Sequence, residues 1–231
     1  MERDQHFMID EALITKIVDA LEIKDNESVL EIGAGKGALT RELVKKSKKI
    51  TAIEIDRALC KVLKKEFPCA KVLSQNAVDW KRYKADKIIG NLPYSICEPV
   101  MNKLLRSEFK AAVLTVPVSF LNGGVLGLLM PLFLNIELIE IVGKRAFSPR
   151  PKIKSKVIRI THKPLDKKEG FLLGIYLCSK GILRNALRES YCKCYGLTKK
   201  QAKEKIPELD FLDKRVYMLG FDEWKELIEK I

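Results

Sequence analysis

The chain has 231 residues, 47% of them hydrophobic, which is enough for one ordinary domain with its own core and a smaller appendage. This composition excludes a disordered protein, and the richest apolar stretch, at 123–134, is too short to cross a membrane. Lysine and arginine total 43 against 30 acidic residues, and the net charge of +13 indicates a polyanionic partner.

The cysteines and histidines indicate no special chemistry. The six cysteines form no CxxC pair and only two histidines are present, so we expect neither a disulfide framework nor a bound metal. The first ten residues are rich in charge and lack the apolar core of a signal peptide. We therefore expect a cytoplasmic protein without membrane association and, because no pattern indicates self-association, a monomer.

Apolar segments alternate with amphipathic ones along the first half of the chain. The expected strands are 28–35, 49–56, 70–78, 85–91 and 110–118. The expected helices are 10–21, 36–47, 57–67 and 97–107, the first capped by Asp10 and the third by Asp56. Strands and helices that alternate at this length predict an α/β fold, with a parallel sheet covered on both faces.

The pattern changes after about residue 135. Segments 135–147 and 154–163 predict a final antiparallel strand pair. From residue 166 onward the signals are helical, at 170–179, 182–191, 198–206 and 222–231. We therefore predict two domains, an α/β domain over residues 1–164 and a small all-helical C-terminal domain over residues 165–231.

A glycine turn follows the first strand of the predicted sheet. Gly33 and Gly35 stand where the backbone can approach a ligand closely, although this turn fits a dinucleotide pyrophosphate as well. Glu31, just before the turn, would repel a phosphate and favour a cation. Glu54, at the end of the next strand, can accept both ribose hydroxyls, a feature that NAD-binding proteins share. Together the two carboxylates favour S-adenosylmethionine, which carries a sulfonium and an ammonium group and no phosphate.

The stretch "NLPY" at 91–94 ends a strand where open α/β sheets bind their ligands. Asn91 offers a side-chain acceptor and Leu92 a backbone carbonyl, whose direction Pro93 fixes. Two such acceptors can localise the lone pair of an aromatic amine toward a methyl donor. Tyr94 offers a ring on which a base can stack. The alternative is an ordinary proline turn that closes a strand.

A basic segment lies between residues 141 and 165. It holds eight lysines or arginines and no acidic residue. A solvated surface usually mixes its charges, so this segment is predicted to contact phosphates. The eight positions are Lys144, Arg145, Arg150, Lys152, Lys154, Lys156, Arg159 and Lys163.

Several motifs in order resemble the KsgA-type rRNA adenine N6,N6-dimethyltransferases, in particular their archaeal and eukaryotic-like branch. They are "QHFMID", "EIGAGKGALT", "IEID", "NLPYSI", "FSPRPKIKSKVIRI" and "LDKRVYML". The resemblance implies a Rossmann-like class I methyltransferase sheet, mostly parallel with an antiparallel last pair. It also implies methyl transfer from S-adenosylmethionine to two adjacent adenosines near the 3′ end of small-subunit rRNA, with a role in small-subunit biogenesis.

The resemblance also implies roles for individual residues. The cofactor residues would be His6, Met8, Gly33, Gly35, Glu54, Asn76 and Asn91. The catalytic residues would be Asn91 with the Leu92 and Pro93 carbonyls, which hold the target amine, and Tyr94 and Phe147, which sandwich the flipped adenine. The RNA-binding residues would be Lys144, Arg145, Arg150, Lys152, Lys154 and Lys156. Taken singly, Phe147 is more typical of a core aromatic, Met8 of a partly structural residue and His6 of a hydrogen-bonded surface histidine.

Two departures from the family pattern keep alternatives open. Asn76 stands where the family usually has Asp, so we expect weaker cofactor binding, with Asp79 a poorer substitute. The usual "QKE" stretch is replaced by "VPVSFLNGG". One alternative is a ribosome-assembly factor that binds RNA with little or no catalysis. Another is an adenine methyltransferase acting on large-subunit rRNA or DNA.

Overall fold

The computed structural model describes residues 5–231, and contacts within the chain divide it into two units. Unit 1 comprises Met1–Phe120 and Asn135–His162, and unit 2 comprises Leu121–Leu134 and Lys163–Ile231. The segment 121–134 therefore groups with the C-terminal helices, although the sequence places it in the first domain. The assignment of separate functions to residues 1–164 and 165–231 stays a prediction.

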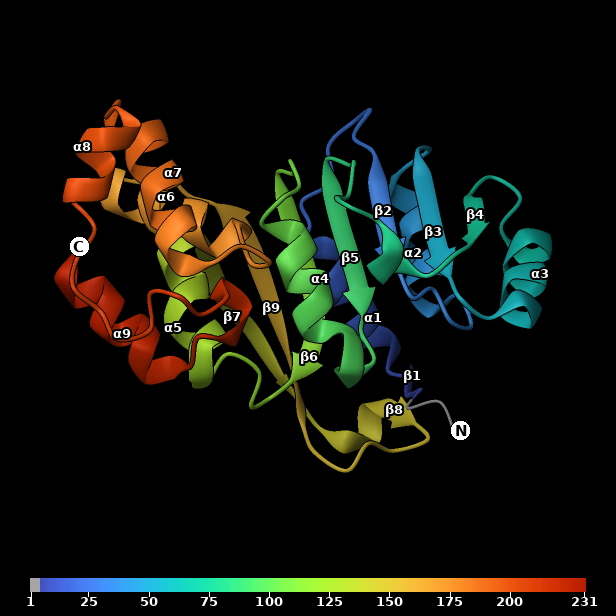
Figure 1. Cartoon of the computed structure of the whole chain (residues 1–231). Coiled ribbons are helices and arrows are strands. Elements are labelled where there is room, and N and C mark those ends of the chain that lie inside the picture. Colours follow the sequence, from blue (N-terminus) through green and yellow to red (C-terminus); the bar gives the residue numbers. More distant parts are fainter. Residues whose placement is uncertain (1–4) are drawn as a thin grey trace. The chain divides into compact units, whose positions relative to one another are not determined.

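Unit 1 is built on a seven-stranded sheet in the order β4-β3-β2-β5-β6-β9-β7 (Figure 1). The strands are β2 (Val29–Ile32), β3 (Ile50–Glu54), β4 (Lys71–Ser74), β5 (Lys87–Asn91), β6 (Ala111–Pro117), β7 (Leu134–Val142) and β9 (Ser155–His162). The pairs β2–β3, β3–β4, β2–β5 and β5–β6 are parallel, whereas β9 is antiparallel to β6. The predicted α/β, Rossmann-like sheet is confirmed.

The strand order reverses at the centre of this sheet. β2 pairs with β3 on one side and with β5 on the other, so the chain leaves the two neighbouring strands β2 and β5 in opposite directions. A crevice opens beyond the carboxyl ends of strands at such a point. The glycine turn follows β2 and the NLPY turn follows β5, so both reach this crevice.

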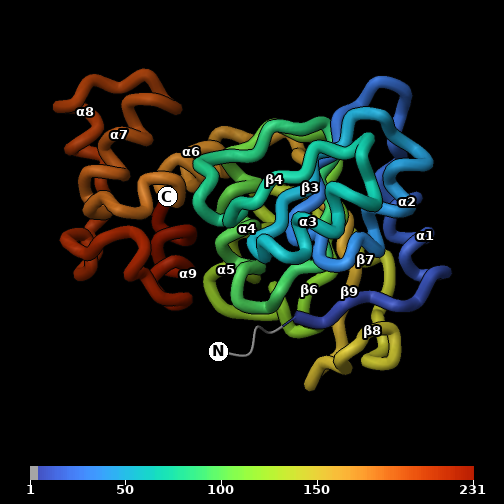
Figure 2. The backbone as a smooth tube through the Cα atoms, turned by 90° about the vertical axis from the view of Figure 1, so that its right-hand side faces the viewer, coloured from blue at the N-terminus to red at the C-terminus, as the bar shows by residue number. Residues whose placement is uncertain are grey.

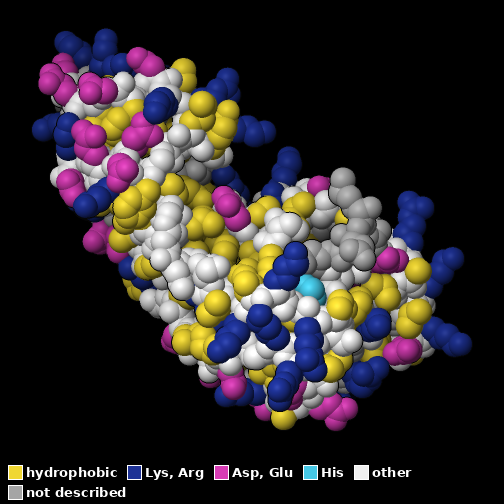
Figure 3. Space-filling view, turned by 90° about the horizontal axis from the view of Figure 1, so that it is seen from below, with side chains coloured by type: hydrophobic (Ala, Val, Ile, Leu, Met, Phe, Trp, Pro, Cys, Tyr) yellow, Lys and Arg dark blue, Asp and Glu magenta, His cyan; other side chains and the backbone are white. Residues whose placement is uncertain are grey.

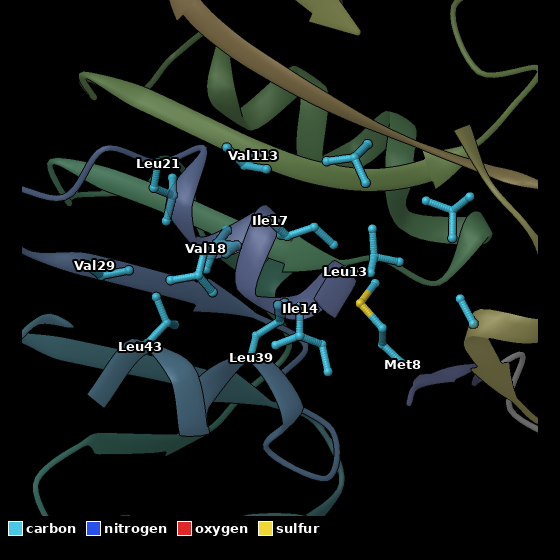
Figure 4. Close-up of a cluster of buried hydrophobic side chains, with 14 of the residues drawn as sticks. Met8, Leu13, Ile14, Ile17, Val18, Leu21, Val29, Leu39, Leu43 and Val113 are labelled. Atoms are coloured by element: carbon cyan, nitrogen blue, oxygen red, sulfur yellow. The ribbon is translucent and has the colours of Figure 1, made fainter. Parts of the chain in front are cut away.

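The helices of unit 1 form where the sequence predicts them. They are α1 (Glu11–Asp19), α2 (Ala38–Lys46), α3 (Arg57–Glu66) and α4 (Cys97–Leu104). Asp10 and Asp56 cap α1 and α3 by accepting backbone N–H groups, as predicted. The apolar face of α1, with Leu13, Ile14 and Ile17, packs into the same core cluster as Met8 (Figure 4). This packing holds Met8 beside the crevice.

A separate two-stranded sheet, which the sequence did not predict, joins segments far apart in the chain. β1 (Phe7–Met8) pairs antiparallel with β8 (Phe147–Ser148), so Met8 lies opposite Phe147. Ile9 N–H also donates to the Ala146 carbonyl. Figure 2 shows the N-terminal segment passing beside β8. The pairing places two predicted site segments, 5–8 and 147–155, next to each other.

Unit 2 is helical. It contains α5 (Gly124–Phe133), α6 (Lys167–Leu177), α7 (Leu183–Tyr195), α8 (Lys199–Glu204) and α9 (Phe221–Lys230). The last four confirm the predicted helical signals, but α5 was not expected, since Pro131 and three glycines at 123–127 weigh against a helix. α5 packs on α6 and α9, where Tyr176 lies between Phe133 and the buried Trp224. Within residues 5–231 no helix combines the length and apolar character needed to cross a bilayer.

Candidate functional site

A cavity of about 310 Å³ opens in unit 1 at the carboxyl ends of β2, β3 and β5. Its volume is in the range of small-molecule sites. All eleven predicted cofactor and catalytic residues line it, and they come from six separate segments of the chain. These residues are His6, Met8, Gly33, Gly35, Glu54, Asn76, Asn91, Leu92, Pro93, Tyr94 and Phe147.

The glycine turn wraps one side of the cavity. Gly33 and Gly35 have φ values of 72° and 56°, in the left-handed region that glycine adopts at no steric cost. A Cβ added to Gly35 would lie 3.1 Å from the Phe7 ring, so the turn also lets β1 approach closely. The bare backbone therefore forms a cradle that larger residues would fill.

Glu54 is held rigidly at the end of β3. One of its carboxylate oxygens accepts the Gly35 N–H at 2.8 Å and the other accepts the Asp56 N–H at 2.8 Å. The side chain is only 3% exposed and lines the cavity. Because each carboxylate oxygen has a second lone pair, a ligand with two adjacent hydroxyls can still bind here.

Glu31 is the second carboxylate of the cavity wall. It is buried, and its Oε2 accepts the Thr40 hydroxyl at 2.6 Å. Burial raises the pKa of Glu31 to about 8; the Thr40 hydrogen bond opposes this rise and the nearby Glu54 charge adds to it. Near neutral pH this carboxyl group is therefore mostly protonated, and a cation in the cavity would favour its ionisation.

Asn76 follows β4 and begins the short helix η1 (Ala77–Asp79). Its side-chain oxygen accepts the Val78 N–H at 3.2 Å, and its Nδ2 donates to Asp79 Oδ1 at 3.3 Å. Asn76 lines the cavity whereas Asp79 is not among the lining residues. An Asp at position 76 would face the Asp79 carboxylate, so this chain's Asn and Asp79 are matched to each other.

The NLPY turn presents hydrogen-bond acceptors. Asn91 Nδ2 donates to the His6 carbonyl at 2.8 Å, which leaves the side-chain oxygen of Asn91 to accept a ligand hydrogen bond. The Leu92 N–H donates to the Thr115 carbonyl of β6 at 3.2 Å and so anchors the turn. The Pro93 carbonyl, the third predicted acceptor, accepts the Ile96 N–H at 3.0 Å. This hydrogen bond belongs to the short helix η2 (Tyr94–Ile96).

Aromatic rings surround these acceptors. The Tyr94 hydroxyl lies 3.1 Å from Ser155 Oγ, and the Tyr94 ring is 6.1 Å from the ring of His6. His6 Nδ1 is 2.9 Å from the Pro149 carbonyl. Phe147 is only 3% exposed and belongs to the core cluster with Met8, yet it lines the cavity. Phe147 and Met8 are thus both structural and site residues.

The basic residues flank the cavity-lining residues Phe147 and Ser155 in the sequence. Lys144 and Arg145 form the helix η3 before β8, and the loop from β8 to β9 contains Arg150, Lys152 and Lys154. These five side chains are exposed, whereas Lys156 in β9 is partly buried and burial lowers its pKa. Figure 3 shows lysine and arginine side chains gathered on the face of the molecule seen from below.

Sequence reasoning missed several lining residues. Phe7, Lys36, Gln75 and Ser155 also face the cavity, and Lys36 Nζ lies 4.6 Å from the centre of the Phe7 ring. Ser155 ends the motif "FSPRPKIKS", which was the one available signal for it. The position of Phe7 depends on the β1–β8 pairing, for which the two-residue strands give no periodic signal.

Comparison with known proteins gives consistent matches. The family described as ribosomal RNA adenine dimethylase matches residues 2–176. A protein of Thermococcus sibiricus named "Probable ribosomal RNA small subunit methyltransferase A" is 33% identical, over 97% of this chain and 89% of the relative. A dimethyladenosine transferase from Plasmodium falciparum superposes with a TM-score of 0.67 at 25% identity, over 96% of this chain and 95% of the other. The 23S rRNA methyltransferase ErmE, at 20% identity and a TM-score of 0.65 over 97% and 98%, shares the fold.

Proposed function

Because the chain belongs to the ribosomal RNA adenine dimethylase family, we propose that it transfers methyl groups from S-adenosylmethionine to N6 of two adjacent adenosines near the 3′ end of small-subunit rRNA. This makes it an S-adenosylmethionine-dependent RNA (adenine-N6,N6) methyltransferase with a role in small-subunit biogenesis. It acts as a monomer in the cytoplasm, and its RNA partner is the small ribosomal subunit.

One observation carries the proposal. A single cavity contains the Glu54 carboxylate, the glycine cradle and the Asn91 amide, whose oxygen can accept a hydrogen bond from a ligand. The first two suit a nucleoside with a ribose diol, and the third suits an amine that needs an acceptor. A binding factor without catalysis has no need for an acceptor placed beside a nucleoside site.

The cavity residues fit S-adenosylmethionine. Glu54 would bind the ribose hydroxyls and Asn76 the adenine edge. Gly33 and Gly35 would let the cofactor approach the backbone closely. His6 and Met8 would cover the side formed by the N-terminal segment. Bound there, the cofactor supplies an electrophilic methyl group on a sulfonium. The buried Glu31 can neutralise a positive group in the cavity.

The NLPY turn would bind the target amine. Asn91 Oδ1 and the Leu92 carbonyl accept its two hydrogens, so the nitrogen lone pair is drawn out of the aromatic ring and becomes nucleophilic. The Pro93 carbonyl is a weaker third acceptor, because it already accepts the Ile96 N–H. Tyr94 and Phe147 would hold the flipped adenine by stacking, worth roughly 1–3 kcal/mol per base. No strong base is needed, since the product loses its proton after transfer.

The basic segment would bind the RNA backbone beside the flipped base. Lys144 and Arg145 directly precede Phe147, and Arg150, Lys152 and Lys154 follow it within the β8–β9 loop. Lys156 is the sixth cation of this set. Contacts with phosphates position the strand without reading its sequence.

The deciding experiment measures methyl transfer from labelled S-adenosylmethionine to small subunits that lack the modification. We expect dimethyladenosine at two adjacent positions near the 3′ end of the rRNA, mapped by primer-extension stops. Asn91→Ala should abolish incorporation while the variant still binds the subunit. The matched control is Asn135→Ala, because Asn135 is exposed on β7.

Each alternative gives a different result in the same assay. Tight subunit binding with no methyl incorporation would identify an RNA-binding assembly factor and overturn the proposal. Dimethyladenosine only on large-subunit rRNA or on DNA would keep the chemistry and replace the substrate.

A further inference from the structure

A buried hydroxyl without a hydrogen-bond partner among residues 5–231 lies in the strand next to the NLPY turn. Thr115 in β6 is 1% exposed, and its Oγ1 has no hydrogen-bond partner within residues 5–231. It is not one of the residues that line the cavity. A buried polar atom without a partner destabilises the folded state, so its presence calls for an explanation.

The sheet places this hydroxyl beside Asn91. Asn91 and Thr115 are paired residues in the parallel strands β5 and β6, so their side chains project from the same face of the sheet. Neighbouring strands are about 4.8 Å apart, a separation that a rotation of either side chain spans. The Thr115 carbonyl also accepts the Leu92 N–H at 3.2 Å. Thr115 thus already anchors the turn through its backbone.

We propose that Thr115 is a positioning residue whose hydroxyl donates to Asn91 Oδ1 when a target base is engaged. This inference rests on the proposed function. The Asn91 amide would then be held at both ends, by the His6 carbonyl at Nδ2 and by Thr115 at Oδ1. Since an amide oxygen has two lone pairs, the second remains for the target amine. The fixed amide plane aims that lone pair at the amine.

The hydroxyl and the methyl group of Thr115 would have separate roles. The methyl group packs in the core, whereas the hydroxyl serves only the bound state. Replacing a buried, unpaired hydroxyl by an apolar group of the same shape is close to neutral or stabilising. A substitution that removes the hydroxyl should therefore lower activity without lowering stability, and one that removes the methyl group should lower stability without lowering activity.

The test compares Thr115→Val with Thr115→Ser in steady-state methyl transfer and in thermal unfolding. We expect Thr115→Val to lower kcat about 3- to 10-fold, the size of one neutral hydrogen bond, with an unchanged Kd for S-adenosylmethionine and an equal or higher Tm. Thr115→Ser should keep the wild-type kcat and have a lower Tm. Thr51→Val in β3 is the matched control and should change neither quantity.

Two results would overturn the inference. One is a wild-type kcat in Thr115→Val, and the other is a kcat that follows Tm across the variants, as a purely structural role requires. Both leave the proposed function intact, because wild-type methyl transfer is measured in the same assay. Absence of transfer by the wild-type protein would instead overturn the function, and this inference with it.

Discussion

The side chain of Asn91 is bonded to the backbone of His6, with Nδ2 donating to the His6 carbonyl at 2.8 Å. This bond joins the end of β5 to the segment that pairs with β8, residues 85 positions apart in the chain. It fixes which end of the amide faces the cavity. The N-terminal segment is therefore part of the site that orients the acceptor, and more than a cover over it.

Asn91→Asp should abolish methyl transfer although it keeps the shape of the side chain. The new carboxylate oxygen would face the His6 carbonyl, so an attraction becomes a repulsion. We expect kcat to fall on the order of 100-fold or more, as is typical when a preorganised polar group is lost from a site. Hydrogen exchange at the Ile9 amide, which bonds to Ala146, should become faster. Asn135→Asp is the matched control, and wild-type kcat in Asn91→Asp would contradict this role.

Gly35→Ala should weaken cofactor binding. Gly35 has a φ of 56°, which costs an alanine roughly 1–2 kcal/mol, and the added Cβ would press on Phe7 at 3.1 Å. The shifted N–H would also lose its bond to Glu54. Calorimetry with S-adenosylmethionine should show roughly 10-fold weaker binding and thermal unfolding a lower Tm. Gly143→Ala, with open space around its Cβ, should change neither, and equal losses in both variants would contradict the role of the turn.

Glu31 should make cofactor binding depend on pH. Its pKa of about 8 means that the free protein holds this proton near neutrality. A cation bound in the cavity favours the ionised form, so binding should release a proton and tighten as pH rises from about 7 to 8. Titrations in buffers of different ionisation enthalpy would detect the released proton. Glu31→Gln should remove the dependence, and an unchanged pH profile in that variant would refute the assignment.

The same pKa also predicts how stability changes with pH. The folded-state pKa is raised above the ordinary glutamate value of 4.5, so the unfolded chain loses this proton first. The contribution of Glu31 to folding stability therefore falls as pH rises from about 4.5 to 8. Glu31→Gln should raise Tm relative to the wild type above pH 8 and have little effect near pH 4.5.

The seven-stranded sheet and the α-helices other than α5 could be predicted from the sequence because each carries its own signal. β2 is apolar at three of its four positions because it is buried on both faces, and Asp10 marks the start of α1. The β1–β8 pair carries no such signal, because two-residue strands are specified by their partners. α5 was hidden by Pro131, whose cost is offset by the packing of Leu129, Met130 and Phe133.

The site was predictable as a set of residues and not as a geometry. The residues that the motifs named line one cavity, and their roles stay predictions. The engagement of the Pro93 carbonyl by Ile96 and the pairing of Asn76 with Asp79 depend on local turns that only the structure reveals. Thr115 gave no sequence signal, since a threonine in an apolar strand is a common core residue.

Exchanging the side chains of Asn76 and Asp79 should separate charge from position. Asn76→Asp alone would place two carboxylates about as close as the present 3.3 Å bond, so one would take up a proton and little affinity would be gained. The double variant Asn76→Asp/Asp79→Asn keeps one carboxylate bonded to one amide, so the pair carries the same single charge as in the wild type. We expect it to bind S-adenosylmethionine up to about 10-fold more tightly than the wild type. Equal affinity of the single and double variants, measured by calorimetry, would contradict the matched pair.

Lys152 and Lys154 should account for part of the salt dependence of RNA binding. Both are exposed in the loop that follows Phe147, and a cation that contacts a phosphate releases a counterion. In Lys152→Ala/Lys154→Ala the slope of log K against log salt concentration should decrease in magnitude by about 1 to 2. Cofactor affinity should stay unchanged, because neither lysine lines the cavity. The control Lys64→Ala/Lys65→Ala removes the same charge from exposed positions of α3. An equal change of slope in both double variants would show that the effect comes from the net charge of the protein and would contradict the prediction. A change confined to Lys152→Ala/Lys154→Ala would assign the phosphate contacts to the loop.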